Sequence, residues 1–196
     1  MCMLEYMGIK LKLHPQVYEP AEDTFLLAEN LAVREGDVAL DMGTGTGLIA
    51  LLMARKASYV LGVDINPIAV ELARENARLN GITNVEFRLS DLFERIEEKF
   101  DAITFNAPYL PGEPEEPIDL ALVGGKRGRE VLDRFIREVP RHLKPTGVVQ
   151  IVQSSITGVE ETLERLERAG LKGRIAAKRH VFFEDIVLIN ARFQAE

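Results

Sequence analysis

Short apolar runs alternate along the chain with longer stretches in which apolar residues recur every three to four positions. Each short run is bounded by Gly, Asp, Asn or Pro, which is typical of buried strands, whereas the longer stretches have the period of amphipathic helices. Strands that alternate with helices favour an α/β fold, in which a mostly parallel sheet carries helices on both faces. The predicted strands are residues 38–40, 59–63, 85–89, 100–105 and 147–152, and the predicted helices are residues 19–33, 48–57, 67–80, 128–143 and 158–169.

Two segments depart from this alternation. Residues 175–182 and 184–192 are rich in Val, Ile and Phe and are separated by almost nothing, so they predict a C-terminal antiparallel hairpin at the edge of the sheet. Residues 108–128 hold several prolines and acids without periodicity. A loop of that length in a compact domain is usually functional or mobile.

The composition narrows the class of protein. The chain has 196 residues, and we expect a single domain over residues 1–196. Its net charge of −7 disfavours sequence-independent binding to a phosphate backbone, so nucleic acid is an unexpected partner. The only cysteine, Cys2, excludes a disulfide within the chain and a Cys-rich zinc site, and no apolar run approaches the ~20 residues that span a bilayer. We therefore expect a cytoplasmic protein that binds no metal and no membrane.

A glycine-rich segment, residues 41–47, follows the first predicted strand and leads directly into a helix. Its glycines allow a tight turn and let a ligand approach the backbone amides at the start of that helix. A tight turn without a ligand is the alternative, because glycine is the default residue wherever the backbone is strained. No Gly-Lys-Ser/Thr follows, which excludes a phosphate-binding loop of the Walker type.

Acidic residues follow the next two predicted strands. Asp64 lies about 20 residues after the glycine loop, where a carboxylate can accept both hydroxyls of a ribose. Asp91 follows the third strand, where it can accept the amine of adenine while Ile65 or Leu92 lies against the ring. Each aspartate alone is more often a solvated loop acid or a helix cap. Their joint position at the carboxyl ends of consecutive strands favours a nucleotide site, since open α/β sheets bind ligands along that edge.

The fourth predicted strand ends in Asn106, Ala107, Pro108 and Tyr109. These residue types also make an ordinary turn. Pro108 favours an extended conformation at Ala107 and so directs the Ala107 carbonyl. The Asn106 side-chain oxygen and that carbonyl can then accept both hydrogens of one NH2 group, while the Tyr109 ring forms a wall of the slot. Such a slot predicts chemistry at a nitrogen without a titratable base.

With these motifs the chain resembles the S-adenosylmethionine-dependent methyltransferases, and among them the HemK/PrmC family, which methylates the glutamine of the Gly-Gly-Gln motif in translation release factors. The resemblance covers nearly the whole chain. Residues 17–24 (Val-Tyr-Glu-Pro-Ala-Glu-Asp-Thr) are similar to the short archaeal and eukaryotic branch, and the other specific segments are residues 41–47, 106–109 and 124–131 (Gly-Gly-Lys-Arg-Gly-Arg-Glu-Val). The chain departs from the family at Ala107, where proline is usual. That difference keeps the carbonyl acceptor but removes a ring that stiffens the loop.

The resemblance implies a Rossmann-like class I methyltransferase fold, with a seven-stranded sheet in the order 3-2-1-4-5-7-6. It also implies a role for each site residue, with Glu19 and Thr24 on the methionine part of the cofactor, Asp64 on the ribose, and Asp91 and Leu92 on the adenine. The implied cofactor-binding residues are Tyr18, Glu19, Thr24, Asp41, Gly43, Gly45, Asp64, Ile65, Asp91, Leu92 and Asn106. The implied catalytic residues are Asn106, Pro108 and Tyr109, which together with Ala107 would hold the substrate amide.

The resemblance further implies a reaction and two protein partners. A methyl group would pass from S-adenosylmethionine to the side-chain nitrogen (N5) of the release-factor glutamine. Bacterial members recognise the release factor with an N-terminal helical domain, whereas residues 1–18 here form only an extension, so we expect no separate substrate-recognition domain. Members of the short branch commonly work with a small zinc-binding activator protein. The predicted edge strand Val85–Leu89 offers alternating apolar residues to such a partner, although these residues can equally face the domain's own core.

Three other functions use the same motifs. The slot can admit a deprotonated lysine, which makes a protein lysine methyltransferase one alternative. A base-flipping adenine N6 methyltransferase is another, although only Lys126, Arg127 and Arg129 form a local basic cluster. A sensor that binds S-adenosylmethionine without catalysis is the third. The presence of Asn106 and Tyr109 beside the cofactor loop argues against a sensor, because a sensor has no use for a slot that holds an amine.

Overall fold

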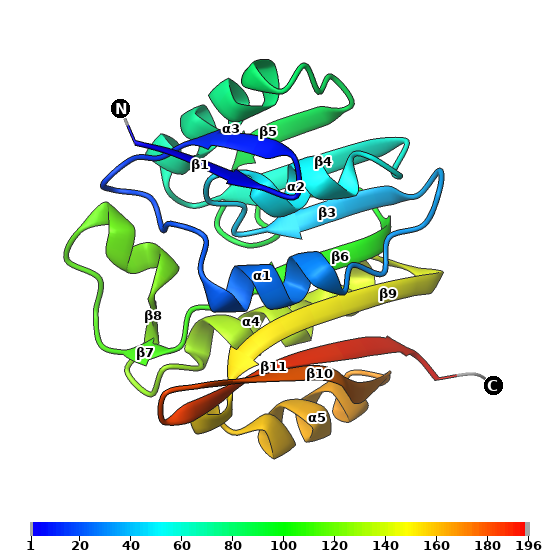
Figure 1. Cartoon of the computed structure of the whole chain (residues 1–196). Helices are drawn as coiled ribbons and strands as arrows, with labels where there is room; N and C mark the ends of the chain where they lie inside the picture. Colours follow the sequence, from blue (N-terminus) through cyan, green and yellow to red (C-terminus); the bar gives the residue numbers. More distant parts are fainter. Residues whose placement is uncertain (1, 195–196) are drawn as a thin grey trace.

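A seven-stranded sheet forms the centre of the computed structural model, which describes residues 2–194 (Figure 1). Strand β11 pairs antiparallel with both of its neighbours, whereas the pairs among the other five strands from β9 to β5 are parallel. In spatial order the strands are β10 (Leu171–Val181), β11 (Glu184–Phe193), β9 (Leu143–Ser154), β6 (Phe100–Asn106), β3 (Val38–Met42), β4 (Tyr59–Asp64) and β5 (Val85–Leu89).

The topology confirms the predicted fold class. Counted from β3, the strands of the sheet lie in the order 3-2-1-4-5-7-6, and the order of strands reverses between the parallel strands β3 and β6, which places the ligand edge at their carboxyl ends. The predicted C-terminal hairpin is present as β10 and β11. It begins at Leu171, four residues before the predicted start, because Leu171 itself packs into the core.

Helices cover both faces of the sheet, as predicted. Alternate residues of β3 face opposite sides, so Ala39 packs with α1, α2 and α3, while Leu40 packs with α4 and α5. The helices are α1 (Glu22–Glu29), α2 (Leu48–Met53), α3 (Pro67–Leu79), α4 (Glu130–Glu138) and α5 (Val159–Arg168), and the short 3-10 turns are η1 (Pro117–Ala121), η2 (Val139–Arg141) and η3 (Ser155–Thr157).

Local chemistry explains where two helices begin and end. Helix α3 agrees with its prediction: the Asn66 side chain accepts a hydrogen bond from the Ile68 amide, and Pro67 occupies the first turn. Helix α1 is shorter than residues 19–33. Its first turn is closed by the Thr24 hydroxyl, which accepts from the Ala21 amide, and the Asn30 side chain donates to the Leu26 carbonyl at its end. Residues 19–21 are therefore not helical.

An N-terminal hairpin was not predicted. It consists of β1 (Met3–Tyr6) and β2 (Ile9–Lys12), joined by a two-residue turn in which Met7 and Gly8 both have positive φ. Its buried residues Ile9 and Leu11 pack on the α2 and α3 side of the sheet. The strands are short and carry charged residues on the outer face, so their period alone does not distinguish them from a polar extension.

The irregular segment after Tyr109 is more ordered than predicted. The short strands β7 (Leu110–Pro111) and β8 (Val123–Gly125) pair in parallel, with η1 between them. The backbone amides of Tyr109 and Leu110 both donate to the Leu122 carbonyl, at 3.1 and 2.7 Å. These bonds hold the segment against the end of β6.

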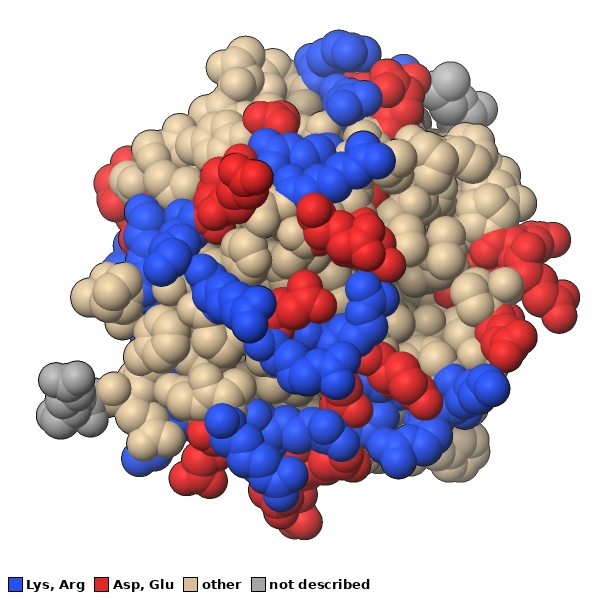
Figure 2. Space-filling model, turned by 180° about the vertical axis from the view of Figure 1, so that it is seen from behind, with Lys and Arg blue, Asp and Glu red and all other residues tan. Residues whose placement is uncertain are grey.

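The charged surface does not form the basic cluster that the sequence suggested. Arg129 is 4% exposed and pairs with Asp133 at 2.9 Å, so it is part of the α4–α5 packing rather than of the surface. On the face opposite to the view in Figure 1, acidic side chains lie between the basic ones (Figure 2). Within residues 2–194 no helix has both the length and the apolar character needed to cross a membrane.

Candidate active site

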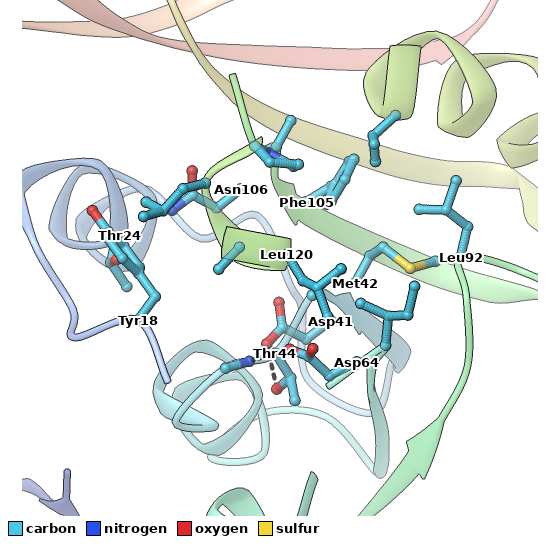
Figure 3. Close-up of a pocket in the computed structure, with 18 of the residues that line it drawn as sticks. Tyr18, Thr24, Asp41, Met42, Thr44, Asp64, Leu92, Phe105, Asn106 and Leu120 are labelled. Carbon is cyan, nitrogen blue, oxygen red and sulfur yellow. Dashed lines mark hydrogen bonds between the residues drawn. The ribbon is translucent and has the colours of Figure 1, made fainter. Parts of the chain in front are cut away.

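A pocket lies at the carboxyl ends of the parallel strands, where the reversal of strand order places it. The glycine loop after β3, the end of β4 and the end of β6 form its walls, and α1 and the η1 segment contribute further side chains. Figure 3 shows Asn106 beside Tyr18 and Thr24 at one end of the pocket and Asp41, Thr44 and Asp64 gathered at another. Polar groups from distant segments thus share one cavity.

The glycine loop is held by two buried hydroxyls around Asp41. Thr44 Oγ1 and Thr104 Oγ1 each donate to one oxygen of the Asp41 carboxylate at 2.8 Å. Burial nevertheless raises the pKa of Asp41 to about 7, because the hydrogen bonds only partly replace the lost hydration. Gly45 has a φ of 55°, which favours glycine, and a Cβ on it would meet nothing within 4 Å.

Asp64 connects β4 to this loop. One carboxylate oxygen accepts from the Gly45 amide and the other from the Asn66 amide, both at 2.9 Å. Burial raises the pKa of Asp64, and the backbone hydrogen bonds act in the opposite direction. Each oxygen keeps a free lone pair, so the half-buried carboxylate can still accept hydrogen bonds from a ligand in the pocket.

The third acid of the pocket has a basic partner. Asp91 pairs with Arg134 of α4 at 3.3 Å, and both side chains are about one third exposed along the pocket. Leu92 is buried with a φ of 47°, an unusual value for a leucine, and lines the pocket with Ile65. An acid beside two apolar side chains has the chemistry that an aromatic ring with an exocyclic amine requires.

The orientation of the Asn106 amide is set by Asp23. Asn106 Nδ2 donates to Asp23 Oδ2 at 3.0 Å, so Asn106 Oδ1 is the atom left to accept a hydrogen bond in the pocket. Asp23 is 9% exposed and also accepts from the Tyr18 hydroxyl, at 3.2 Å to each oxygen. Burial, followed by the charge of Asp23, raises the pKa of Tyr18, which therefore stays a protonated donor.

The backbone that follows Asn106 is fixed from two sides. The Ala107 amide donates to the Val152 carbonyl of β9 at 3.1 Å, a bond that proline cannot make. On the other side, a Cβ on Gly128 would lie 2.3 Å from the backbone carbonyl oxygen of Tyr109, and one on Gly124 would lie 2.5 Å from the backbone carbonyl oxygen of Pro108. The glycines of residues 124–131 therefore allow the backbone of that motif to pack directly on the backbone of residues 106–109.

Tyr109 and the η1 segment limit the acceptor end of the pocket. Burial raises the pKa of Tyr109, and the negative charges of Glu184 and Asp23 act in the same direction. Leu120 and Leu122 line the pocket from the segment that was predicted to be a functional or mobile loop. In Figure 3, Leu120 points into the same cavity as Asn106.

Nearly all predicted site residues line this one pocket. Those that do are Tyr18, Thr24, Asp41, Gly43, Gly45, Asp64, Ile65, Asp91, Leu92, Asn106, Ala107, Pro108 and Tyr109. Glu19 is the exception, since it is exposed and does not line the pocket, and the geometry gives its predicted cofactor contact no support. The acid of that segment that does line the pocket is Asp23.

Asp23 and Arg134 are the functional candidates that sequence reasoning missed. Asp23 stands within residues 17–24, so the motif marked its position, but only the fold brings it to Asn106. Arg134 lies on α4 without any motif of its own. Among residues 2–194, no group of three or more His, Cys, Asp or Glu side chains is placed to hold a metal ion.

The comparisons with known proteins agree with this fold and pocket. The methyltransferase small domain family matches residues 14–178, and the chain belongs to that family. A Methanocaldococcus jannaschii protein, provisionally assigned as a protein N5-glutamine methyltransferase, is 54% identical over 96% of this chain and 98% of its own length. Methyltransferase HEMK2 of Homo sapiens is 35% identical, over 88% of each chain. These relatives match the resemblance to the HemK/PrmC family that the motifs carry.

Solved structures give the same result. E. cuniculi Mtq2, in a complex with Trm112 responsible for methylation of the eRF1 translation termination factor, superposes with a TM-score of 0.76 at 28% identity. The match covers 91% of this chain and 99% of that chain. A methyltransferase from Pyrococcus furiosus has a TM-score of 0.73 at 25% identity, over 96% of this chain and 91% of that one.

Proposed function

We propose that this protein transfers a methyl group from S-adenosylmethionine to the side-chain nitrogen (N5) of the glutamine in the Gly-Gly-Gln motif of a translation release factor. One observation carries the proposal. Asn106 is oriented so that its oxygen, not its NH2 group, is free in the pocket. An oriented acceptor next to a nucleoside-type pocket suits an acceptor group that has hydrogens on nitrogen.

The residues present fit S-adenosylmethionine. Asp64 keeps lone pairs for the ribose hydroxyls, and Asp91 can accept the adenine amine beside Leu92 and Ile65. The backbone at Gly43 and Gly45 carries no side chain that would block the methionine part. When bound, the cofactor supplies a methyl group on a sulfonium, whose positive charge the carboxylate of Asp41 can attract from within the pocket.

The protein's own part in the reaction is to hold and polarise the acceptor. Asn106 Oδ1 and the Ala107 carbonyl accept the two hydrogens of the substrate amide, which favours positive charge on nitrogen as the new N–C bond forms. The bound cofactor would supply the methyl group and keep the electrons of the C–S bond on its sulfur, and the methylated nitrogen would lose its proton to solvent on leaving the slot. Tyr109 and Leu120 exclude water from the slot, and alignment supplies most of the rate.

The partner proposal concerns strand β5. It is an edge of the sheet, so its outer backbone groups are open to a further strand. Of its apolar residues, Phe87 is buried in the core of this chain, while Leu89 is 37% exposed and Val85 is half-buried. We propose that a small zinc-binding activator covers this edge, as the Mtq2–Trm112 complex suggests, and that the reaction takes place in the cytoplasm.

The test is methylation of a release factor. The protein is incubated with S-adenosylmethionine and a Gly-Gly-Gln release factor, with and without the activator, and tandem mass spectrometry locates any added methyl group. We expect methyl on the glutamine and a loss on the order of 10²-fold in Asn106→Ala. Asn84→Ala is the matched control, because its side chain holds the Ala54 and Ala57 carbonyls outside the pocket. Methylation of lysine alone, or cofactor binding without transfer to any protein, would refute the proposal.

A further inference from the structure

Asp23 of α1 is a buried carboxylate that connects α1 to the end of β6 at the acceptor end of the pocket. It accepts from the Asn106 amide at 3.0 Å, from the Thr24 backbone amide at 2.7 Å and from the Tyr18 hydroxyl. Asn106 lies 83 positions away in the chain. A 9% exposed acid with this many donors is part of a built network and not a solvated loop residue.

The Asp23 carboxylate selects one orientation of the Asn106 side-chain amide. An ionised carboxylate only accepts hydrogen bonds, so it admits the NH2 group of Asn106 and repels its oxygen. The alternative rotamer of Asn106, with Nδ2 in the pocket, would place two N–H donors against the N–H donors of a substrate amide. In the observed arrangement the negative charge of Asp23 also polarises the Asn106 amide, which makes Oδ1 a stronger acceptor.

We propose that Asp23 is a positioning residue that fixes the flip state of Asn106 and thereby makes the slot selective for a group with hydrogens on nitrogen. This inference rests on the proposed function. The family resemblance implies only cofactor contacts for residues 17–24. The inference gives Asp23, in the same segment, a role on the acceptor side of the reaction.

The kinetic test uses Asp23→Asn. The new NH2 group can donate to Asn106 Oδ1 and turn the amide, so we expect kcat to fall on the order of 10²-fold while the dissociation constant of S-adenosylmethionine stays within about threefold. Asp37→Asn is the matched control. Asp37 is equally buried, at 8% exposure, and accepts from the Arg34 amide at 2.8 Å outside the pocket. We expect this control to keep the wild-type kcat.

A spectroscopic test does not depend on the substrate. In protein labelled with 15N at asparagine, the side-chain protons of Asn106 are assigned by their loss in Asn106→Ala. We expect one proton to lie downfield in the wild type, because it donates to a carboxylate, and to move upfield in Asp23→Asn. An unchanged resonance together with a wild-type kcat in Asp23→Asn would overturn the inference. A wild-type protein that methylates no glutamine would instead overturn the proposed function.

A second inference rests on a different feature, the tip of the β10–β11 hairpin. Phe182 and Phe183 are 88% and 100% exposed, and Phe182 has a φ of 51°, which is strained for an aromatic residue. Two adjacent aromatic side chains in this state contribute nothing to the core. Such outliers are a reason to look for a function at the surface.

The tip lies at the same end of the sheet as the acceptor slot and next to it, because Ile186 pairs with Ser154, two residues beyond Val152, which pairs with Asn106. Glu184 follows Phe183 directly and accepts a hydrogen bond from the Ser154 hydroxyl at the end of β9. Its negative charge adds to burial in raising the pKa of the Tyr109 hydroxyl. Ile156 of η3, which is 66% exposed, belongs to the same rim, since the adjacent Ser155 hydroxyl accepts from the Asp185 amide at 3.0 Å. A protein that inserts a side chain into the slot must face this rim.

We propose that Phe182, Phe183 and Ile156 form a docking surface for apolar side chains of the protein that presents the acceptor glutamine. Its continuity with the slot selects this occupant, because the rest of a protein substrate has to lie beside the residue that enters the slot. The proposal rests on the proposed function but not on the role of Asp23.

The test compares a protein and a peptide substrate. In the double variant Phe182→Ser and Phe183→Ser, we expect KM for the intact release factor to rise on the order of tenfold at an unchanged kcat, as for the loss of an aromatic anchor. For a short peptide around the glutamine, kcat/KM should not change. Met7→Ser is the matched control, with 49% exposure and a positive φ at the turn of the other hairpin. Equal KM values for the double variant and the wild type would overturn this inference, whereas an inactive wild type would overturn the proposed function.

Discussion

The two ends of the pocket are built differently. At the cofactor end, the polar contacts join the ends of neighbouring strands: Thr44 and Thr104 donate to Asp41, and the Gly45 and Asn66 amides donate to Asp64. At the acceptor end, the Asn106 amide depends on Asp23, 83 positions away, and Tyr109 packs on the backbone of Gly128.

This difference predicts which variants should change cofactor affinity and which should change turnover. The cofactor end is supported by its own strand ends, so changes there should alter cofactor affinity. The acceptor end is supported by α1, β9 and the Gly-rich motif, so changes in those distant segments should alter turnover even where they touch no ligand. Four further experiments separate the two ends.

The largest expected effect is that of Gly128→Ala at the acceptor end. Gly128 has a φ of 79°, and the new Cβ would lie 2.3 Å from the backbone carbonyl oxygen of Tyr109. The substitution should therefore lower the free energy of unfolding by about 2–4 kcal/mol and reduce kcat by moving Tyr109. Urea unfolding and methyl-transfer kinetics measure both. Gly170→Ala is the control, because Gly170 has a φ of 84° but nothing within 4 Å of its Cβ. Equal losses in both variants would show that the contact with Tyr109 is unimportant.

Asp64→Ala tests the cofactor end. We propose that the Asp64 carboxylate accepts hydrogen bonds from the ribose, so its loss should weaken S-adenosylmethionine binding by about 10- to 100-fold, equivalent to about 1.5–3 kcal/mol. Titration calorimetry measures the dissociation constant. Glu19→Ala should change it less than about twofold, since surface substitutions away from a site have small effects and Glu19 does not line the pocket. A large effect of Glu19→Ala would restore the cofactor contact that the family resemblance implies.

The pKa of Asp41, raised to about 7 by burial, makes cofactor affinity depend on pH. A cationic ligand favours the carboxylate form, so the dissociation constant should fall by several-fold as pH rises from 6 to 8. Without ligand the same raised pKa works against folding: the group contributes less stability as pH rises from about 4 to about 7. Titration calorimetry from pH 6 to 8 should give a dissociation constant that does not change with pH for Asp41→Asn and one that changes as in the wild type for Asp37→Asn. An affinity that falls with rising pH would contradict this role of Asp41.

The smallest expected effect is that of Ala107→Pro, which installs the residue usual in the family. The ring stiffens the chain but removes the amide that donates to the Val152 carbonyl, so we expect a net loss of about 1 kcal/mol in the free energy of unfolding. Chemical denaturation measures it. A gain in stability would mean that the Val152 carbonyl finds another donor.

Much of the fold was predictable because short segments of the sequence determine its strands and helices. Apolar runs between turn residues predict β3 to β6, and the helical period of residues 67–80 predicts α3. The N-terminal hairpin was missed, since its four-residue strands are too short for a period to be recognised. The basic cluster was wrong at Arg129, because the sequence does not show that Asp133 and the Thr157 and Gly158 carbonyls enclose its guanidinium.

The sequence by itself determined the strand ends that carry Asp64 and Asn106, since glycines, acids and the tetrapeptide follow recognisable apolar runs. Only the tertiary structure decided that Asp23 and not Glu19 enters the pocket, that Asn106 presents its oxygen, and that Phe182 stands at the rim. The physical reason is the range of the interactions. Propensity and hydrophobic period act over a few neighbouring residues, whereas the direction of a side-chain amide depends on whichever charge the folded chain places beside it.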